Sequence, residues 1–302
     1  MQLINKQEII QKLNENHYSE ATIRVYQSWI ERFMKYHQIE FDQYSIKHIS
    51  EYVSSLSLKN LKTSTYNQAL NAIVFFYNKI LKLPISKAFV SELRLSNHEN
   101  LPDTLTKEQI DSIVCHLKGS YQLLVYLLYG CGLRSSEALN LKVKDIDQVN
   151  NRLTVSNQKY FRTLSIPTKI SGELNNQIYF VSKMHAKDSK SKFFSKTDVN
   201  NSYLFPMKQL CNNQDGLLIR MSIISNTLNY NISAATKKTN ITPKVTAQTF
   251  RHSYAVRLLQ NQIDIKTVQK LLGHKHASST LIYTYIAQNI SQRKSLSPLD
   301  LK

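Results

Sequence analysis

The chain has 302 residues, 42% of them hydrophobic, so it can bury ordinary cores and is not a disordered tail. Its 39 Lys and Arg outnumber its 21 Asp and Glu, and the formal charge of +18 favours a polyanionic partner, nucleic acid first, over a merely basic solvated surface. No apolar run approaches the roughly 18 residues of a membrane span and the opening MQLINKQEII lacks a signal-peptide pattern, so we expect no membrane association and a cytoplasmic or nucleoid-associated protein.

Helical periodicity governs the first hundred residues. Within 19–37 apolar side chains recur at three- and four-residue steps, and Ser19 is placed to cap the helix; the predicted face consists of Ile23, Tyr26, Ile30, Phe33, Met34 and His37. Residues 46–57 form a shorter amphipathic stretch. A third helix is predicted at 61–81, ending before Pro84, with a buried side made of Leu70, Ile73, Val74, Tyr77 and Leu81. These stretches predict a packet of four or five helices.

The periodicity then breaks, and the chain changes character. Residues 91–104 carry polar side chains and a proline, so we predict a linker at 93–103 between a helical domain at 1–92 and a second domain at 104–302. The elements predicted next are a helix at 105–117, an apolar helix at 121–128, a GCG turn, the helix RSSEALNL, and two strands, RLTVS (152–156) and FRTLSIP (161–167), that form a hairpin.

Helices resume after residue 170 and dominate the rest of the chain, apart from an exposed loop predicted at 185–202. Three of them close the sequence: AQTFRHSYAVRLL (247–259), DIKTVQKLLGH (264–274), with Asp264 at its cap and Gly273 just past its end, and the short SSTLIYTYIA (278–287). The fold class is therefore mainly α with a small β-sheet, in two domains.

The cysteines and the ligand inventory argue against bound groups. Cys115, Cys131 and Cys211 are too few and too scattered for a disulfide framework or a zinc site, and their apolar neighbours predict small core residues in a reducing compartment. The chain carries no phosphate-binding GxxxxGK[ST] loop and no carboxylate cluster for magnesium. We expect neither a metal nor a cofactor.

Several polar residues are unremarkable singly. Arg134 and Glu137, three apart after two glycines, could be a surface ion pair, and Lys159 could be a solvated turn lysine. Gln248, Arg251 and His252 lie on the helix at 247–259, while His274 follows Gly273 and Tyr283 lies on the helix at 278–287.

Together, these residues carry a resemblance. The tyrosine recombinases, the phage-integrase family, have a signature of Arg, Lys, Arg, His and then Tyr nine residues after the His. This chain resembles that family almost position for position in two strings, GCGLRSSEALNLKVKDID and TFRHSYAVRLL…VQKLLGHKHASSTLIYTYI. The helices HYSEATIRVYQSWIERFMKYH and STYNQALNAIVFFYNKIL are similar to the amino-terminal DNA-binding helices of integron-type integrases in particular. The resemblance covers about residues 8–288. It implies a helical core-binding (SAM-like) domain followed by a mixed α/β catalytic domain.

The resemblance also implies roles, and the chemistry explains them. Attack on a phosphodiester builds negative charge on the nonbridging oxygens, which forked guanidinium groups match. A tyrosine hydroxyl needs a proton acceptor or a strongly positive surround, and the leaving 5′ oxygen needs a proton donor. The implied roles are a phosphate clamp for Arg134 and Arg251, protonation of the 5′ oxygen for Lys159, a phosphate hydrogen bond for His274, covalent attachment for Tyr283, and orientation of Arg134 for Glu137.

One position departs from the pattern of the family. The family usually has His-x-x-Arg, whereas this chain has Gln248 three residues before Arg251. The amide lies at i−3, so we expect it to point at the phosphate, but it cannot take up a proton. We expect that His252 cannot replace it simply, because the adjacent position is turned about 100° around the helix. Tyr285 lies about 200° from Tyr283, so only one of them faces the site; we expect Tyr285 to be a packing residue.

The function implied is a site-specific recombinase that cleaves and rejoins double-stranded DNA through a covalent 3′-phosphotyrosine, for integration or for recombination of cassettes or mobile elements. A homo-tetramer on two synapsed sites is implied with it. One alternative is a type IB topoisomerase, which the whole-chain resemblance disfavours. The other is a catalytically impaired DNA-binding regulatory protein derived from a recombinase, with Gln248 as its sign; the five other catalytic positions, all intact, disfavour it.

Overall fold

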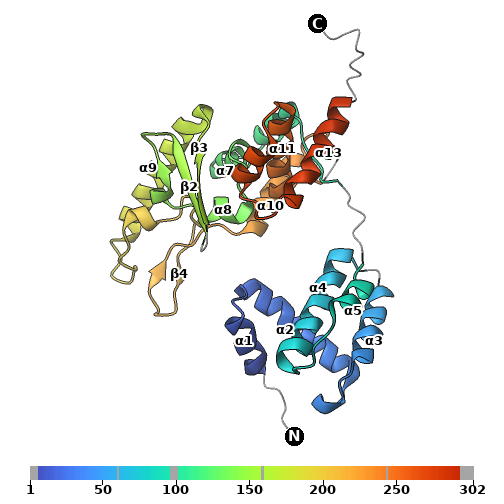
Figure 1. Ribbon diagram of the computed structural model, residues 1–302. Coiled ribbons are helices and arrows are strands. Elements are labelled where there is room, and N and C mark those ends of the chain that lie inside the picture. The colour runs from blue at the N-terminus through green and yellow to red at the C-terminus, as the bar shows by residue number, and fades with distance from the viewer. Residues whose placement is uncertain (1–5, 60, 96–100, 158–159, 243, 293–302) are drawn as a thin grey trace. The chain divides into compact units, whose positions relative to one another are not determined.

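The computed structural model describes residues 6–59, 61–95, 101–157, 160–242 and 244–292. The chain divides into two compact units, Met1–Asn100 and Leu101–Lys302. Most described residues are helical and the strands are few (Figure 1), so the predicted fold class is confirmed. Among these residues, no helix combines the length and the apolar character needed to cross a membrane.

The N-terminal unit is a packet of helices around one core. Its elements are α1 (Lys6–Glu15), α2 (Glu20–His37), the 3₁₀ turn η1 (Phe41–Gln43), α3 (Ile46–Ser57), α4 (Thr63–Phe75), the π turn η2 (Phe76–Ile80) and α5 (Lys87–Leu93). The predicted cap is confirmed, since the Ser19 hydroxyl accepts the Thr22 N–H at 3.3 Å. Phe33, Ile30 and Tyr77 are completely buried, while Val74 and Leu81, predicted to be buried, are only partly so.

The end of this unit overlaps the predicted linker. The Tyr66 hydroxyl donates a hydrogen bond to the Leu93 carbonyl at 3.0 Å, and the Asn67 side chain bonds both the N–H and the carbonyl of Leu95. Residues 93–95 are therefore held against α4, because their backbone groups find partners there. Residues 96–100 lie outside the described part.

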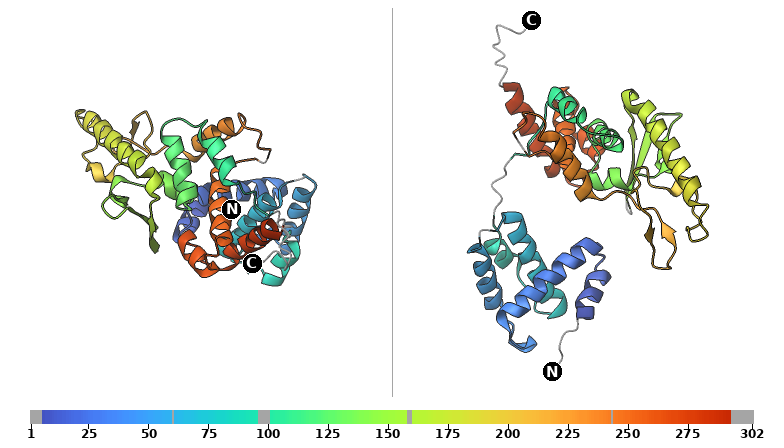
Figure 2. Two further views of the ribbon diagram at one scale, coloured as in Figure 1. Left: turned by 90° about the horizontal axis from the view of Figure 1, so that it is seen from above. Right: turned by 180° about the vertical axis from the view of Figure 1, so that it is seen from behind.

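The second unit carries a helical bundle and a small sheet. Its α-helices are α6 (Lys107–Val114), α7 (Ser120–Gly130), α8 (Ser135–Asn140), α9 (Ser171–Asp188), α10 (Ser225–Thr236), α11 (Ala247–Gln260), α12 (Ile265–Leu272) and α13 (Ser278–Gln292), with 3₁₀ turns at η3 (Val143–Asp145), η4 (Thr168–Ile170) and η5 (Val199–Asn201). Helix α11 packs against both α7 and α13. Figures 1 and 2 show α9 beside the strands and the other long helices gathered around α11.

The sheet has antiparallel order β1-β2-β3, from β1 (Ile146–Asp147), β2 (Arg152–Asn157) and β3 (Tyr160–Ser165). Arg152 pairs with Ser165 and Asn157 pairs with Tyr160, so the predicted hairpin is confirmed. Lys159, predicted in its turn, lies outside the described residues. A second pair, β4 (Cys211–Asn212) and β5 (Leu218–Ile219), was not predicted, because strands of two residues show no alternation.

Two local predictions were wrong. The exposed loop expected at 185–202 begins inside α9, which continues to Asp188, and that carboxylate is only 8% exposed because Arg220 holds it at 2.6 and 2.8 Å. Of the three cysteines expected in the core, Cys131 is buried but Cys115 is exposed and Cys211 is half-buried. Cys115 follows the last turn of α6, on its solvent side.

Candidate active site

The centre of the site is an arginine in the core. Arg251 lies in the second turn of α11, which the threonines Thr246 and Thr249 cap, and its side chain is 1% exposed. Its Nη1 donates to the Gly132 carbonyl at 2.6 Å and its Nη2 to the Leu272 carbonyl at 2.7 Å. Burial, with the charge of Arg134 nearby, lowers the pKa of Arg251 to about 10, so the guanidinium is charged at neutral pH.

A carboxylate joins three arginines beside it. Glu137 accepts hydrogen bonds from Arg134 Nη1 at 2.7 Å and from Arg162 Nη1 and Nη2 at 3.0 and 2.8 Å, and it lies 3.5 Å from Arg251 Nη1. Burial works against its charge, but the hydrogen bonds from Arg162 and Arg134 outweigh burial and lower the pKa of Glu137 to about 2. The anion therefore fixes the spacing of three cations that would otherwise repel.

Arg134 is the accessible member of this cluster. It precedes α8, where its N–H donates to Glu137 at 2.8 Å, and its Nη2 donates to the Gly273 carbonyl at 3.0 Å. Its side chain is 39% exposed. With Arg162, His274, Lys270 and other residues it lines a hollow of about 480 Å³. This hollow is basic and open to solvent, so it is suited to an anion such as a phosphate.

Two glycines let backbone approach the arginines closely. Gly273 caps α12 with φ +63°, and a Cβ built there would lie 2.7 Å from Arg162 Nη1. Gly132 has φ +62°, and a Cβ there would overlap the Tyr254 ring. Both positions need a left-handed backbone and empty space at once, which glycine alone supplies without strain. The caps predicted for α12, Asp264 and Gly273, are confirmed.

Tyr283 is buried on α13 at the edge of the cluster. Its side chain is 3% exposed, and its hydroxyl lies 2.8 Å from His252 Nδ1. The His274 ring is stacked beside it, with ring centroids 6.2 Å apart and planes at 19°. Burial raises the pKa of the Tyr283 phenol, although Arg251 and Arg134 oppose the rise. The hydroxyl is therefore protonated at neutral pH in this arrangement.

His274 is fixed from several sides. Its Nδ1 lies 2.8 Å from the Thr280 hydroxyl, its N–H donates to the Gln269 carbonyl at 3.1 Å, and the Gln269 amide donates back to the His274 carbonyl at 3.1 Å. Burial, and then the charges of Arg251 and Arg134, lower the pKa of His274 to about 4. The imidazole is therefore neutral at neutral pH, and its ring orientation is set before any substrate arrives.

His252 belongs to the site, contrary to the expectation that its neighbour position turns it away. The rotation around α11 does separate it from Arg251, but it directs the ring toward α13, which packs on that side of α11. A helix considered by itself cannot show this, because the partner lies 31 residues away in sequence. Burial and the charge of Arg251 lower the pKa of His252 to about 4.

Of three other residues considered in the sequence, two are exposed and one lies outside the described residues. Gln248, in the first turn of α11, is exposed, whereas Arg251 one turn on is buried. Tyr285 is 63% exposed, so one tyrosine of the pair faces inward, as predicted, but the packing role expected for Tyr285 was wrong. Lys159 lies outside the described residues, so its part in the site stays a prediction.

Arg162 was missed by the sequence analysis, although a signal was present. It shares the strand face of Leu164, which is buried, because the two positions are separated by one residue in β3. An arginine on the buried side of a short strand needs a buried anion as its partner. Here that anion is Glu137, and Arg162 Nε also donates to the Leu271 carbonyl at 2.9 Å.

Two further features do not add to this site. Among the described residues, the side chains of His37, His48 and Glu51 bring possible metal-ligand atoms within 4.8 Å of one another. However, His48 Nδ1 accepts the Ser45 N–H at 3.0 Å, so the neutral ring carries its proton on Nε2 and has no lone pair left for a cation.

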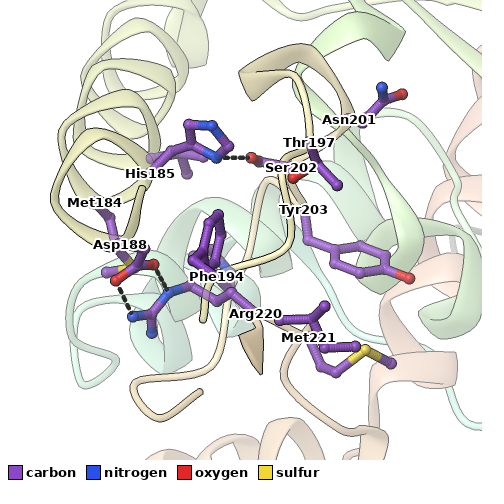
Figure 3. Close-up of a pocket in the computed structure, with 13 residues that line it drawn as sticks. Met184, His185, Asp188, Phe194, Thr197, Asn201, Ser202, Tyr203, Arg220 and Met221 are labelled. Carbon is purple, nitrogen blue, oxygen red and sulfur yellow. Dashed lines mark hydrogen bonds and ion pairs between the residues drawn. The ribbon is translucent and has the colours of Figure 1, made fainter. Parts of the chain in front are cut away.

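The other feature is a hollow of about 200 Å³ at the end of α9 (Figure 3). Its polar groups are matched to each other: Asp188 with Arg220, and His185 with Ser202 at 3.0 Å. Arg220 donates in addition to the Met207 and Lys208 carbonyls. These contacts fasten the segment after α9 to the helix, so we assign the hollow a structural role.

Comparison with known proteins finds relatives that match most of the chain. The model of the phage integrase family matches residues 103–289, and that of the phage integrase N-terminal SAM-like domain matches residues 6–87. A protein from Escherichia coli named integrase/recombinase is 29% identical over 94% of this chain and 89% of its own length. Tyrosine recombinase XerC from Lacticaseibacillus casei is 25% identical, over 90% of each chain.

Two solved structures share the fold of this chain. The Tn1549 transposon integrase in complex with transposon right end DNA superposes with a TM-score of 0.66 at 17% identity, covering 97% of this chain and 99% of the other. The XerH site-specific recombinase bound to difH substrate gives a TM-score of 0.65 at 19% identity, covering 96% and 84%. At these identities the likeness is one of fold.

Proposed function

The chain belongs to the phage integrase family of tyrosine recombinases, and from that premise we propose that it recombines DNA at specific sites through a covalent 3′-phosphotyrosine formed on Tyr283. The observation that carries the proposal is the position of the Tyr283 hydroxyl. It is buried beside the neutral rings of His252 and His274, at the edge of a cluster in which Glu137 holds Arg134, Arg162 and Arg251.

The arginines still have donors for a phosphate. A guanidinium has five N–H groups, and Arg134 uses Nη1 for Glu137 and Nη2 for Gly273, which leaves further hydrogens on both nitrogens. Arg251 donates from Nη1 to the Gly132 carbonyl and from Nη2 to the Leu272 carbonyl, and its Nη1 also lies 3.5 Å from Glu137, so the second hydrogen of Nη2 is the donor left for a phosphate. A nonbridging phosphate oxygen at each guanidinium would receive the negative charge that grows as the phosphorus becomes five-coordinate.

The reaction then proceeds as an exchange of oxygens. The Tyr283 oxygen forms a bond to phosphorus while the bond to the 5′ oxygen breaks, and Lys159 gives that leaving oxygen a proton. His274 and Gln248 hydrogen-bond the phosphate, and Glu137 keeps Arg134 in position. Because the phosphotyrosine keeps the bond energy, attack by a 5′ hydroxyl rejoins the strand without a nucleotide or a metal.

Double-stranded DNA is the proposed partner. The surplus of +18 supplies many phosphate contacts, which dominate the affinity of DNA-binding proteins. We assign DNA gripping to 1–92, the connection to 93–103 and catalysis to 104–302, working in the bacterial cytoplasm at the nucleoid as a homo-tetramer on two synapsed sites. Integration or the movement of cassettes or other mobile elements is the task that we propose, with an integron-type integrase as the model.

A two-plasmid assay tests this function. Each plasmid carries a site that the protein has selected from a random-sequence duplex library, and Tyr283→Phe serves as the control. Joined plasmids that depend on Tyr283 support a recombinase. Relaxed plasmids without joining would indicate topoisomerase activity instead, and bound, unaltered DNA would indicate the impaired regulatory protein that Gln248 suggests.

A further inference from the structure

We propose that His252 is the proton acceptor for Tyr283, a role that rests on the proposed function and adds a catalytic residue to it. When the Tyr283 oxygen bonds to phosphorus, its proton passes to His252 Nδ1, while the bond from phosphorus to the 5′ oxygen breaks and that oxygen takes a proton from Lys159. In the rejoining step the imidazolium returns the proton to the departing phenolic oxygen.

The geometry is that of a nucleophile and its base. The Tyr283 hydroxyl lies 2.8 Å from His252 Nδ1, within the distance needed for direct transfer. The two rings are 5.5 Å apart between centroids, on α11 and α13, which pack against each other. In the neutral ring that accepts the hydroxyl proton, Nε2 carries the other proton, so Nδ1 has the free lone pair that a base requires.

Other groups near the hydroxyl are less suited to accept this proton. His274 is stacked on the Tyr283 ring, but its Nδ1 lies 2.8 Å from the Thr280 hydroxyl, which engages that nitrogen. Gln248 is exposed, and an amide cannot be protonated near neutral pH. This chain lacks the histidine that the family has at position 248. A histidine nevertheless contacts the hydroxyl of Tyr283, because His252 supplies it.

The charges around His252 make this base responsive to DNA. Burial, and then the charge of Arg251, lower the pKa of His252. His274 and Tyr283 are the titratable groups beside it, and the charge of Arg134 lowers the pKa of both. A phosphate bound at Arg251 and Arg134 would offset their positive charge. The affinity of His252 for a proton then rises on substrate binding, so the base is weak in the free protein and stronger when a phosphate is in place.

The decisive variant is His252→Asn. The asparagine oxygen can occupy the place of Nδ1 and accept the same hydrogen bond, but it cannot take up the proton, so the variant separates positioning from proton transfer. His116→Asn, an exposed histidine after α6, is the matched control. Single-turnover cleavage is measured on a nicked duplex carrying a selected site, from about pH 4, where His252 of the free protein titrates, to about pH 9. DNA affinity and melting temperature are measured over the same range.

We expect His252→Asn to bind DNA like the wild type and to cleave more slowly by on the order of 10² to 10⁴ at neutral pH. The cleavage rate of this variant should rise with pH, because the Tyr283 phenol must ionise without a proton acceptor beside it. A fluorinated tyrosine at position 283 has a more acidic phenol and should restore part of the lost rate. Wild-type cleavage should fall at the acid end of the range, where His252 becomes protonated. His116→Asn should match the wild type in every measurement.

Two results would overturn the assignment. One is a folded His252→Asn protein that cleaves within a few-fold of the wild type with the same pH profile. The other needs no variant: wild-type cleavage that is independent of pH down to about pH 4, the pKa of His252 in the free protein, leaves no titrating acceptor. A wild-type protein that binds DNA and forms no covalent adduct at any pH would instead contradict the proposed function.

Discussion

Arg162 holds both carboxylate oxygens of Glu137 from the neighbouring strand β3, with Nη1 at 3.0 Å and Nη2 at 2.8 Å. This fork, together with the contact from Arg134, orients the carboxylate that joins the arginines of the proposed phosphate clamp. The pair is largely buried, with side chains 17% and 14% exposed, so solvent screens it weakly.

Arg162→Lys tests this fork. A lysine keeps the charge but cannot bond two oxygens in one plane, so Glu137 should turn and Arg134 should lose its place. We expect cleavage to fall about tenfold to hundredfold, which corresponds to one or two charged hydrogen bonds, with little change in DNA affinity. Arg152→Lys, at an exposed position on β2, is the control and should cleave normally. An active Arg162→Lys protein would remove Arg162 from the machinery.

Gly273→Ala tests the close approach of backbone to the arginines. The new Cβ would meet Arg162 at 2.7 Å in a left-handed backbone conformation, φ +63°. We expect a loss of about 1 to 3 kcal/mol in the free energy of unfolding and a slower cleavage step, because Arg162 and the Gly273 carbonyl that binds Arg134 must both shift. Gly172→Ala, where a Cβ meets nothing within 4 Å, should change neither measurement appreciably.

Glu137→Gln should reveal how pH acts on the cluster. The pKa of Glu137 is lowered from 4.5 to about 2 in the folded protein, so its ionised form adds stability above the unfolded value. That stability is lost as the pH falls through the folded value, and it amounts to about 3 kcal/mol. The difference in unfolding free energy between wild type and Glu137→Gln should therefore shrink by this order on acidification from about pH 5. Urea denaturation at several pH values measures it.

The exposed Glu173→Gln change is the control for that series, since this carboxylate lies on the solvent side of α9. Because its side chain is exposed, this change should alter the free energy of unfolding by less than about 0.5 kcal/mol. A Glu137→Gln curve that runs parallel to the wild type over the same interval would show that Glu137 is not the group that titrates.

Gln248→His restores the residue that the family usually carries. If the position serves to donate a hydrogen bond to the phosphate, glutamine already does so, and His252 supplies the proton acceptor. We therefore expect cleavage to change only a few-fold across about pH 6 to about pH 9. A gain of about a hundredfold or more, strongest above the imidazole pKa, would mean that the wild type lacks its base and would count against the role of His252.

Local signals were enough to predict much of the fold. Ser19 and Asp264 cap their helices, and Gly273 ends α12, because caps and left-handed glycines act within one turn of chain. The hairpin of β2 and β3 followed from two runs of β-forming residues around a polar turn. Strands of two residues, such as β1, gave no pattern to detect.

The site was predictable only in its inventory. The tyrosine, the two arginines and the glutamate were predicted from the family resemblance that their order and spacing carry, but the contacts that join them cross long stretches of chain. Arg162 reaches Glu137 over 25 residues and His252 reaches Tyr283 over 31, and neither contact leaves a mark in the periodicity of one element. The prediction that Cys115 is a core residue failed for a related reason. It was based on apolar neighbours in sequence, but the side chain is exposed in the fold.

Tyr283 is the residue that we propose becomes joined to DNA. The direct measurement is the covalent adduct on a nicked duplex that carries a selected site, compared for wild type, Tyr283→Phe and Tyr285→Phe, with the attached peptide identified by mass spectrometry. We predict an adduct at Tyr283 in the wild type, none in Tyr283→Phe despite nearly unchanged DNA affinity, and most of the activity in Tyr285→Phe, whose side chain is 63% exposed. An adduct that survives in Tyr283→Phe, or that disappears in Tyr285→Phe, would contradict the assignment.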